Sequence, residues 1–325
     1  MLKARTMINM DSEDEGVATV SCAGGLRVQF TKEIQRTTVQ GSLLTLKVEG
    51  LLGGHSGQDI DKERQNADLL MARMIQRLLK ETKGQLVSFN GGTKDNAIPR
   101  ECEASLIYES DEEAAKAEEL ACELAETYAE ELTPAEPDFS CEISCETNRT
   151  AEAIPQDAAK EFICAMRLAP NGIQKRNIKM DGFVVVSLNL GVVRTEEDRI
   201  VMIFSPRSSV ASLQEDTKER LNTLAETFGF TVSHSSEYPG WSFKEDSPVR
   251  EICKESYKEL FGEDLKIEAI HAGLECGLFS DAIKGLDAIA IGPTIANCHT
   301  PDEYLTLDSF ERFYEFLKDI LSRLG

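Results

Sequence analysis

Apolar residues recur with two different periods along the first part of the chain. In SLLTLKVEG, Leu44, Leu46 and Val48 alternate with polar residues, which predicts a half-buried strand. The next apolar residues are three or four positions apart, which predicts a helix with one buried face. These residues are Ala67, Leu70, Met71, Met74, Ile75, Leu78 and Leu79. Strands around QLVSFN and ECEASLIYE and an acidic helix over 111–132 complete a first unit.

A second unit follows in a similar order. Its predicted elements are the strand DFSCEIS, a helix over 155–168, the strands GFVVVSLNLGVV and RIVMIF, a helix over 210–228 and the strand FTVSHS. The order indicates two halves of the β-α-β-β-α-β type, as in a ferredoxin-like sandwich. We therefore expect residues 25–238 to form one domain of two such halves.

Beyond Trp241 strands and helices alternate, which is typical of a parallel sheet covered on both faces. The predicted elements are a helix over 247–261, the strand LKIEAIH, a short helix in LECGLFSDAIKG, the strand LDAIAIG and a helix over 309–324. Two strands are too few for such a sheet, and TMINMD near the N-terminus looks like the end of another. We expect one α/β domain made of residues 1–24 and 239–325, interrupted by the α+β insert.

Composition narrows the class of protein. With 41% hydrophobic and 28% charged residues, the chain is typical of a soluble globular protein. A net charge of -22 argues against binding to nucleic acid. The sequence contains no apolar run that predicts a membrane span or a signal peptide, so we expect a cytoplasmic protein. The nine cysteines include no CxxC pair, which fits a reducing compartment. Cys141 and Cys145 are predicted to share one strand face as small buried residues rather than as metal ligands.

The few histidines and one aspartate are candidates for chemistry. His299 follows a predicted parallel strand, where ligands of α/β sheets bind, although a plain loop histidine is the alternative. Asp11 also follows a strand and could pair with an imidazole on zinc, or belong to an acidic turn only. His55 lies among glycines and could stabilise an oxyanion, or serve as a turn residue. For His234 and His271 the context favours structural roles.

Eight segments, in order, resemble those of the aminoacyl-histidine dipeptidases, also called Xaa-His or cytosol non-specific dipeptidases. They are INMDSEDEG, CAGG, VEGLLGGHSGQDI, FNGGTKDNAIP, SLNLGVV, FSPRSS, HAGLECGLF and IGPTIANCHTPDEYL. The resemblance spans nearly the whole chain. It implies a catalytic α/β domain interrupted by a lid domain. It also implies hydrolysis of Xaa-His and other dipeptides by a metal-bound hydroxide on two zinc ions, with cobalt or manganese as alternatives.

The resemblance also implies roles for individual residues. Asp11 and His299 resemble ligands of the two metals, and His55 resembles the lid histidine that reaches toward the scissile carbonyl. Asn96 and Arg207 resemble the lid residues that hold the carboxylate of the substrate, for which the planar fork of arginine is well suited.

Two further residues of the LECG segment, Glu275 and Gly277, are expected to face the substrate. The dipeptide is the expected partner, and a homodimer is left open.

In the family, an HxD motif, a metal-bridging aspartate and a Glu-Glu pair come before the point where this sequence begins, so these three motifs are missing here. The first glutamate of that pair is the general base, and a catalytic zinc needs about three protein ligands. We therefore expect an N-terminally truncated enzyme that is inactive as the 325-residue chain. The alternatives are a non-catalytic peptide-binding or dimerisation module, or a fragment without independent function.

Overall fold

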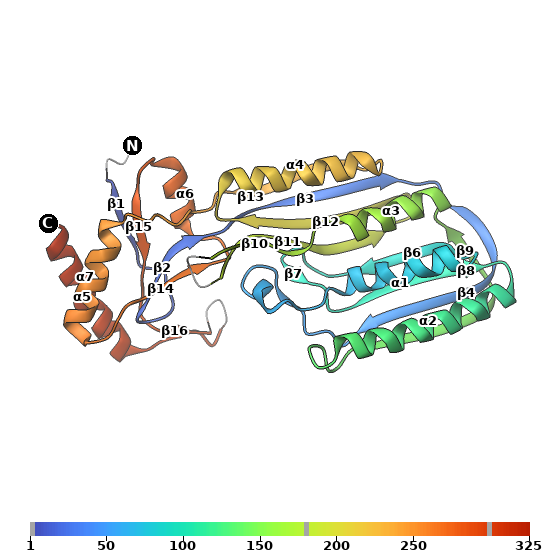
Figure 1. Ribbon diagram of the computed structural model, residues 1–325, viewed down its shortest axis with the longest axis horizontal. Helices are drawn as coiled ribbons and strands as arrows, with labels where there is room; N and C mark the ends of the chain where they lie inside the picture. Colours follow the sequence, from blue (N-terminus) through green and yellow to red (C-terminus); the bar gives the residue numbers. More distant parts are fainter. Residues whose placement is uncertain (1–3, 179–181, 298–300) are drawn as a thin grey trace.

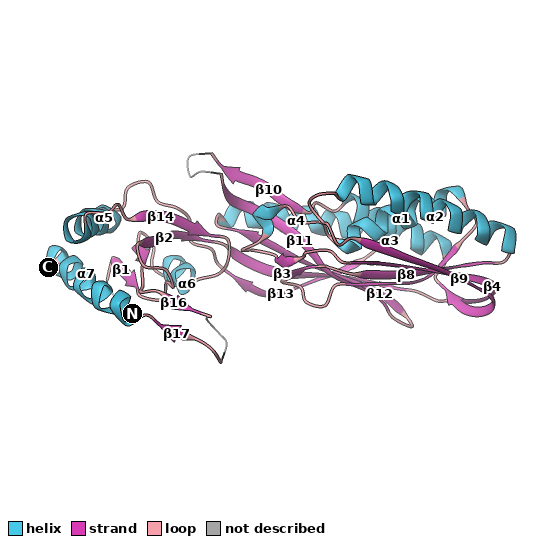
Figure 2. Ribbon diagram, turned by 90° about the horizontal axis from the view of Figure 1, so that it is seen from below, coloured by secondary structure: helices cyan, strands magenta, loops and turns pink. Residues whose placement is uncertain are grey.

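The computed structural model describes residues 4–178, 182–297 and 301–325. These residues form two units that lie end to end (Figure 1). The small unit (residues 4–22 and 241–325) has a four-stranded sheet, and the large unit (residues 24–238) has a nine-stranded sheet. The helices of the large unit lie together on one face of its sheet, which leaves the other face open (Figure 2).

The sheet of the small unit joins segments from both ends of the chain. Its order is β1-β15-β2-β14. The strands are β1 Thr6–Asn9, β2 Val17–Cys22, β14 Lys266–Ile270 and β15 Asp287–Ala290. β1 therefore pairs with a C-terminal strand, as TMINMD predicted, whereas β2 was not predicted. The expectation of a parallel sheet was wrong, because β15 and β2 are antiparallel where Ala290 meets Thr19. A short apolar strand carries no signal of its direction.

Three helices cover the two faces of this sheet. They are α5 Pro248–Phe261, α6 Glu275–Ala282 and α7 Leu307–Leu324. α5 and α7 share one apolar core with Ile289, while α6 packs in a second core with Ala288 and Ala290. Successive side chains of β15 thus enter opposite cores, as the period of a strand requires. A two-stranded pairing of β16 Ile295–Ala296 with β17 Tyr304–Leu305 precedes α7.

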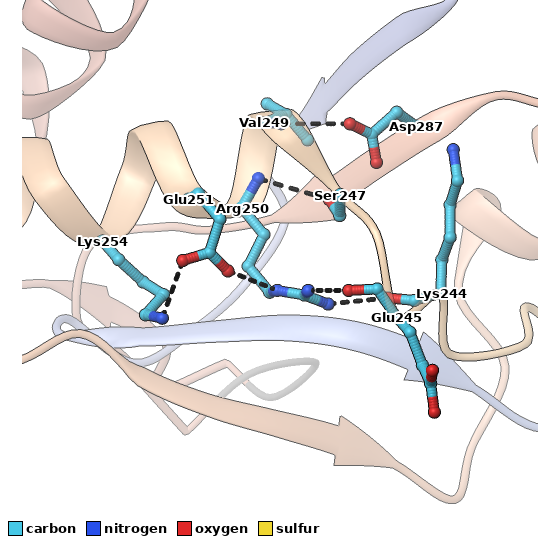
Figure 3. A network of polar contacts seen from close by, with 8 residues as sticks. All are labelled: Lys244, Glu245, Ser247, Val249, Arg250, Glu251, Lys254 and Asp287. Atoms are coloured by element: carbon cyan, nitrogen blue, oxygen red, sulfur yellow. Dashed lines mark hydrogen bonds and ion pairs between the residues drawn. The ribbon is translucent and has the colours of Figure 1, made fainter.

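Polar contacts hold the beginning of α5 against the sheet (Figure 3). Ser247 caps the helix by accepting a hydrogen bond from the backbone N–H of Arg250 at 3.3 Å. The Arg250 guanidinium donates to the carbonyls of residues 244–245. The Asp287 carboxylate accepts from the Val249 N–H at 3.0 Å, which connects the helix to β15. The first turn of α5 therefore has fixed partners on both sides.

The large sheet has the order β13-β3-β12-β11-β6-β8-β4-β9, with β10 paired to β11. One set is β4 Thr37–Glu49, α1 Ala67–Glu81, β6 Gln85–Gly91, β8 Cys102–Tyr108, α2 Asp111–Leu132 and β9 Ser140–Ala153. The other set is β3 Gly24–Glu33, α3 Gln156–Leu168, β11 Phe183–Thr195, β12 Arg199–Ser208, α4 Ala211–Thr227 and β13 Thr231–Tyr238. The shorter elements are β5 Gly54–His55, η1 Ile60–Lys62, β7 Ala97–Ile98 and β10 Gly172–Asn177.

The assignment of DFSCEIS to the second half was wrong. This segment lies in β9, which pairs with β4 and completes the first set. The first strand of the second set is instead β3, between β12 and β13. The whole first set is therefore inserted between β3 and α3. Order along the chain could not show this, because strand pairing is a long-range property.

The predictions made from local sequence patterns agree with the structure better than the predictions about strand pairing. The predicted stripe of α1, including Leu70, Met74 and Leu78, is buried in the core of the large unit. Cys141 and Cys145 lie half-buried on one face of β9, packed against the same core. The eight cysteines among the described residues carry free thiols. Within the same residues, no helix is long and apolar enough to cross a membrane.

Asp68 gives the large unit a pH-dependent stability. This residue of the first turn of α1 is fully buried, and burial raises the pKa of its carboxyl to about 8 against smaller opposing effects of Cys102 and Arg194. The folded state therefore binds the proton more tightly than the unfolded state. Its contribution to stability is complete below the unfolded pKa of 3.8 and is lost as the pH rises through about 8.

We expect Asp68→Asn to be more stable than the wild type at pH 8 to 9 and to lose much of the fall in stability between pH 5 and 9, because the amide cannot ionise. Urea unfolding across this range measures the effect. Asp157→Asn, at an exposed first-turn position of α3, is the matched control and should leave the pH profile unchanged. A profile of Asp68→Asn parallel to that of the wild type would contradict the assignment.

Candidate functional site

His55 has a defined tautomer at the edge of the large unit. It pairs with Ala97 in the short β5–β7 ladder, after Gly53 and Gly54, whose φ angles are 58° and 143°. Its Nδ1 accepts hydrogen bonds from two backbone N–H groups, those of Gly57 at 3.2 Å and Gln58 at 3.0 Å. Nδ1 is therefore unprotonated, and the neutral ring carries its proton on Nε2.

The charge state of His55 depends on its surroundings. Burial and then the charge of Arg207 lower its pKa, while Asp59 has a smaller opposite effect. The Asp59 carboxylate also accepts the backbone N–H of His55 at 2.8 Å. The imidazole is thus neutral at neutral pH and presents an Nε2–H donor.

Asn96 and Arg207 line one cavity of about 140 Å³. The Asn96 carbonyl accepts a hydrogen bond from the Ser56 N–H at 2.9 Å, which places Asn96 next to the His55 turn. Arg207 comes from β12, where it is opposite Ser187 of β11. Segments that are far apart in the sequence therefore meet at one cavity.

Arg207 is a buried cation, with only 8% of its surface exposed. Its Nη1 donates to the Tyr238 hydroxyl at 2.9 Å. Among the residues that the structure describes, no carboxylate lies within ion-pair distance of it, and its Nε is buried without a hydrogen-bond partner. A buried charge without a counter-ion is costly. The arrangement therefore favours an anionic ligand.

Buried polar side chains hold the loop that carries Asn96. The Asn189 Nδ2 donates to the Ala97 carbonyl at 2.8 Å, and the Ser205 hydroxyl donates to the Asp95 carbonyl at 2.8 Å. Asn66, which caps α1, donates to the Leu190 carbonyl at 2.8 Å. The loop is thus bonded to two central strands of the sheet, so that its position is preorganised.

His271 is a residue that the sequence did not mark for the site. It belongs to the small unit, yet its Nε2 lies 2.7 Å from the Ser187 hydroxyl of β11. Burial and then the charge of Arg207 lower the pKa of His271 to about 3, so the ring is neutral. A Cβ on Gly57 would lie 2.3 Å from the His271 carbonyl oxygen. No local motif predicts contacts between such distant segments.

A larger cavity, of about 760 Å³, opens between the two units. It is lined by Gly57 and Phe183 of the large unit and by His271, Phe243 and the strand β14 of the small unit. Its volume is in the range of small-molecule sites. The cavity therefore has room for a small ligand between the units, against His271.

The first candidate metal ligand, Asp11, follows the end of β1. Asp11 is exposed, and its backbone N–H donates to the Asn9 side chain at 2.7 Å. The Asn9 amide in turn approaches Glu275 at 3.4 Å, so Asp11 and Glu275 share a neighbour. His299 lies outside the described residues. Within those described, no three His, Cys, Asp or Glu side chains form a group that could hold a metal, so these residues do not by themselves fit a two-metal centre.

Gly277 is buried at the junction of the units. A Cβ at this position would lie 2.5 Å from the Pro239 carbonyl oxygen. Close packing therefore accounts for a glycine here, and a contact with substrate stays a prediction.

The site can be compared with known proteins. Residues 83–323 match the model of the family described as Peptidase family M20/M25/M40. The chain is 33% identical over 329 residues to the cytosol non-specific dipeptidase of Escherichia coli (strain K12), covering 99% of this chain and 67% of that protein. Its structure is similar to that of the aminoacylhistidine dipeptidase from Vibrio alginolyticus, with a TM-score of 0.94, 33% identity and coverage of 99% and 66%. The chain thus spans about two thirds of the length of these relatives.

The two charged neighbours of His55 should shift its pKa in opposite directions. Removal of the cation in Arg207→Met should raise the pKa of His55, whereas Asp59→Asn should lower it further. Titration of the imidazole by NMR measures both changes, and the ¹⁵N shifts should identify Nδ1 as the unprotonated nitrogen. An unchanged pKa in Arg207→Met would show that the guanidinium does not act on His55.

Proposed function

Because this chain belongs to peptidase family M20/M25/M40, we propose that it acts in the metal-dependent hydrolysis of dipeptides, with Xaa-His dipeptides as one substrate class. The names of the two relatives support the dipeptide as substrate. The observation that carries the proposal is the buried Arg207, which lacks a carboxylate partner among the described residues and shares a cavity with Asn96.

In this proposal Arg207 and Asn96 bind the terminal carboxylate of the dipeptide. The guanidinium offers parallel N–H donors that match both oxygens of a carboxylate, and the amide adds a further donor. A neutral ligand would leave the cation uncompensated. The site therefore favours peptides with a free C-terminus.

His55 is proposed to stabilise the oxyanion. Its Nδ1 is occupied by two backbone donors, so Nε2–H is the donor available to the carbonyl oxygen of the substrate. A neutral imidazole with its proton on Nε2 can donate this hydrogen bond. Such a preorganised donor contributes about 10²–10³ in rate where it has been removed from other enzymes.

A divalent metal pair would supply a nucleophilic water at neutral pH. We propose Asp11 and His299 as ligands on this side of the centre, with Glu275 linked to Asp11 through the Asn9 side chain. Zinc, cobalt or manganese suits carboxylate and imidazole donors. Glu275 and Gly277 as substrate contacts and a cytoplasmic location are further parts of this proposal.

The role of Arg207 is tested by Arg207→Lys. We expect the affinity of the chain for glycyl-histidine to fall about tenfold or more, because a point charge does not reproduce a bidentate contact. Isothermal titration calorimetry measures the affinity. Arg27→Lys is the matched control, since Arg27 lines the same cavity but is half-exposed and 3.8 Å from Asp95. Equal binding by wild type and Arg207→Lys would contradict the carboxylate contact.

Catalysis is tested in a separate assay of dipeptide hydrolysis. That the 325-residue chain is inactive alone stays a prediction, checked with β-alanyl-histidine and added zinc or cobalt. Metal-dependent turnover would overturn the expected inactivity and support dipeptide hydrolysis.

A second candidate function is dimerisation, which the outer face of α7 favours. Apolar residues recur there at alternating spacings of three and four, as in a coiled-coil seam. They are Leu307, Phe310, Tyr314, Leu317, Leu321 and Leu324, of which all but Leu317 are exposed.

The stripe is complementary to itself when two copies are antiparallel. Leu307 then meets Leu324 of the second copy, and Phe310 meets Leu321. On the flank, Glu311 faces Lys318 of the second copy. An isologous dimer requires such self-complementarity, so a second copy of this chain is the occupant that we propose.

Phe310→Lys should weaken this dimer about tenfold or more, because it places an unpaired charge in the seam of both copies. Sedimentation velocity measures the association. Leu278→Lys, a change at another exposed apolar residue on α6, is the matched control and should leave the dimer intact. A wild-type chain that stays monomeric would contradict the second-copy interface. A chain that binds other proteins but does not associate with itself would contradict it as well.

A further inference from the structure

We propose that Tyr238 is a positioning residue that orients the Arg207 guanidinium toward the carboxylate of a bound dipeptide. This inference rests on the proposed function and adds a residue to it. Its basis is a row of residues across three neighbouring strands, together with a contact from the small unit.

The row consists of Tyr238, Gly25 and Arg207. Gly25 of β3 is opposite Arg207 on one side and opposite Tyr238 on the other. Residues opposite one another in adjacent strands point to the same face of a sheet. The outer two strands are about 9–10 Å apart, so an ordinary side chain on the middle strand would separate their side chains. Glycine removes this obstacle.

The Tyr238 side chain occupies the space that a side chain on Gly25 would need. A Cβ on Gly25 would lie 2.7 Å from the Tyr238 hydroxyl oxygen, well inside van der Waals contact. The hydroxyl therefore lies over the middle strand, where it accepts a hydrogen bond from Arg207 Nη1 at 2.9 Å. The tyrosine side chain can reach across the middle strand to the guanidinium only because Gly25 has no side chain between them.

An irregularity in β13 directs Tyr238 to this position. The register with β3 shifts between Ser235 and Tyr238, and Ser236 has a φ of 54°. A bulge of this kind changes the direction of the side chains that follow it. The strained residue Ser236 therefore lies within β13, two residues before Tyr238, and not in a turn between strands.

The contact leaves one edge of the guanidinium available. With Nη1 bonded to the tyrosine, the Nε and Nη2 edge remains, and Nε is buried without a partner within the described part of the chain. Two parallel N–H donors on one edge bind a carboxylate in bidentate fashion. Tyr238 therefore determines which edge of Arg207 faces the ligand.

The small unit takes part in this arrangement through Gly273. A Cβ there would lie 2.9 Å from the Cε2 atom of Tyr238, so the ring is packed against the loop that leads into α6. The same loop follows His271 and precedes Glu275. The orientation of Arg207 in the large unit is thereby coupled to the position of the small unit.

The test compares the affinity of the full chain for glycyl-histidine and for glycyl-histidine amide, which lacks the carboxylate charge. The ratio of the two affinities is the carboxylate preference. A residue that only stabilises the fold would lower both affinities together. Tyr238→Phe should reduce the preference about five- to tenfold, since it removes one hydrogen bond to a charged group. Arg207→Met should abolish the preference.

Three further variants sharpen the test. The double variant Tyr238→Phe/Arg207→Met should equal Arg207→Met alone, because the tyrosine acts only through the arginine. Gly273→Ala should lower the preference in the same way by displacing the ring. Tyr108→Phe is the matched control, since this buried hydroxyl lies 3.2 Å from that of Thr82, away from the site, and its loss should leave the preference unchanged.

The outcomes separate the two proposals. A wild type that prefers the carboxylate and a Tyr238→Phe variant with the same preference would overturn the role of Tyr238 while supporting that of Arg207. A wild type that binds both ligands equally, or neither, would overturn the carboxylate contact and the role of Tyr238 with it. Melting temperatures of all variants show whether a change in affinity reflects loss of fold.

Discussion

Two reciprocal backbone hydrogen bonds between Cys22 and Trp241 determine how the two units are arranged. The Cys22 N–H donates to the Trp241 carbonyl at 3.0 Å, and the Trp241 N–H donates to the Cys22 carbonyl at 2.9 Å. The chain leaves the small sheet and returns to it at this one place. β3 begins just after this crossing and β13 ends just before it, and the two strands are antiparallel neighbours in the large sheet. Gly25 and Tyr238, opposite one another in this pair, lie close to the crossing.

Small residues make the crossing sterically possible. A Cβ on Gly24 would lie 2.4 Å from the backbone nitrogen of Gly240, a distance that no side chain could occupy. The Ser21 hydroxyl adds a hydrogen bond to the Trp241 carbonyl at 2.8 Å. The same close packing continues at Gly277 against Pro239 and at Gly273 against Tyr238. Glycines at the junction thus serve packing between the units, and this accounts for several glycines in segments that also resemble a family motif.

Electrostatics at the junction follow from burial without counter-ions. Arg207 is buried, and its charge lowers the pKa of both His55 and His271, after burial as the larger cause. Both rings are therefore neutral, whereas the Arg207 guanidinium keeps its positive charge. A neutral donor beside a fixed cation suits a ligand that carries a carboxylate at one end and a polarisable carbonyl near it. The same low-polarity surroundings that suppress protonation also strengthen each hydrogen bond to such a ligand.

The sequence by itself determined the local elements and several site candidates. Periodicity predicted α1, α2 and the shared face of Cys141 and Cys145, because residues a few positions apart share one local geometry. Motifs selected His55, Asn96 and Arg207; the fold places Asn96 and Arg207 at one cavity, and the charge of Arg207 acts on His55. Only the tertiary structure decided that β9 pairs with β4, that β3 begins the second set, and that the small sheet is mixed. It alone brought His271 to Ser187 and Tyr238 to Arg207. The reason is that strand pairing, register shifts and packing across glycines depend on contacts between distant segments, whereas a sequence pattern reports only on residues that are neighbours along the chain.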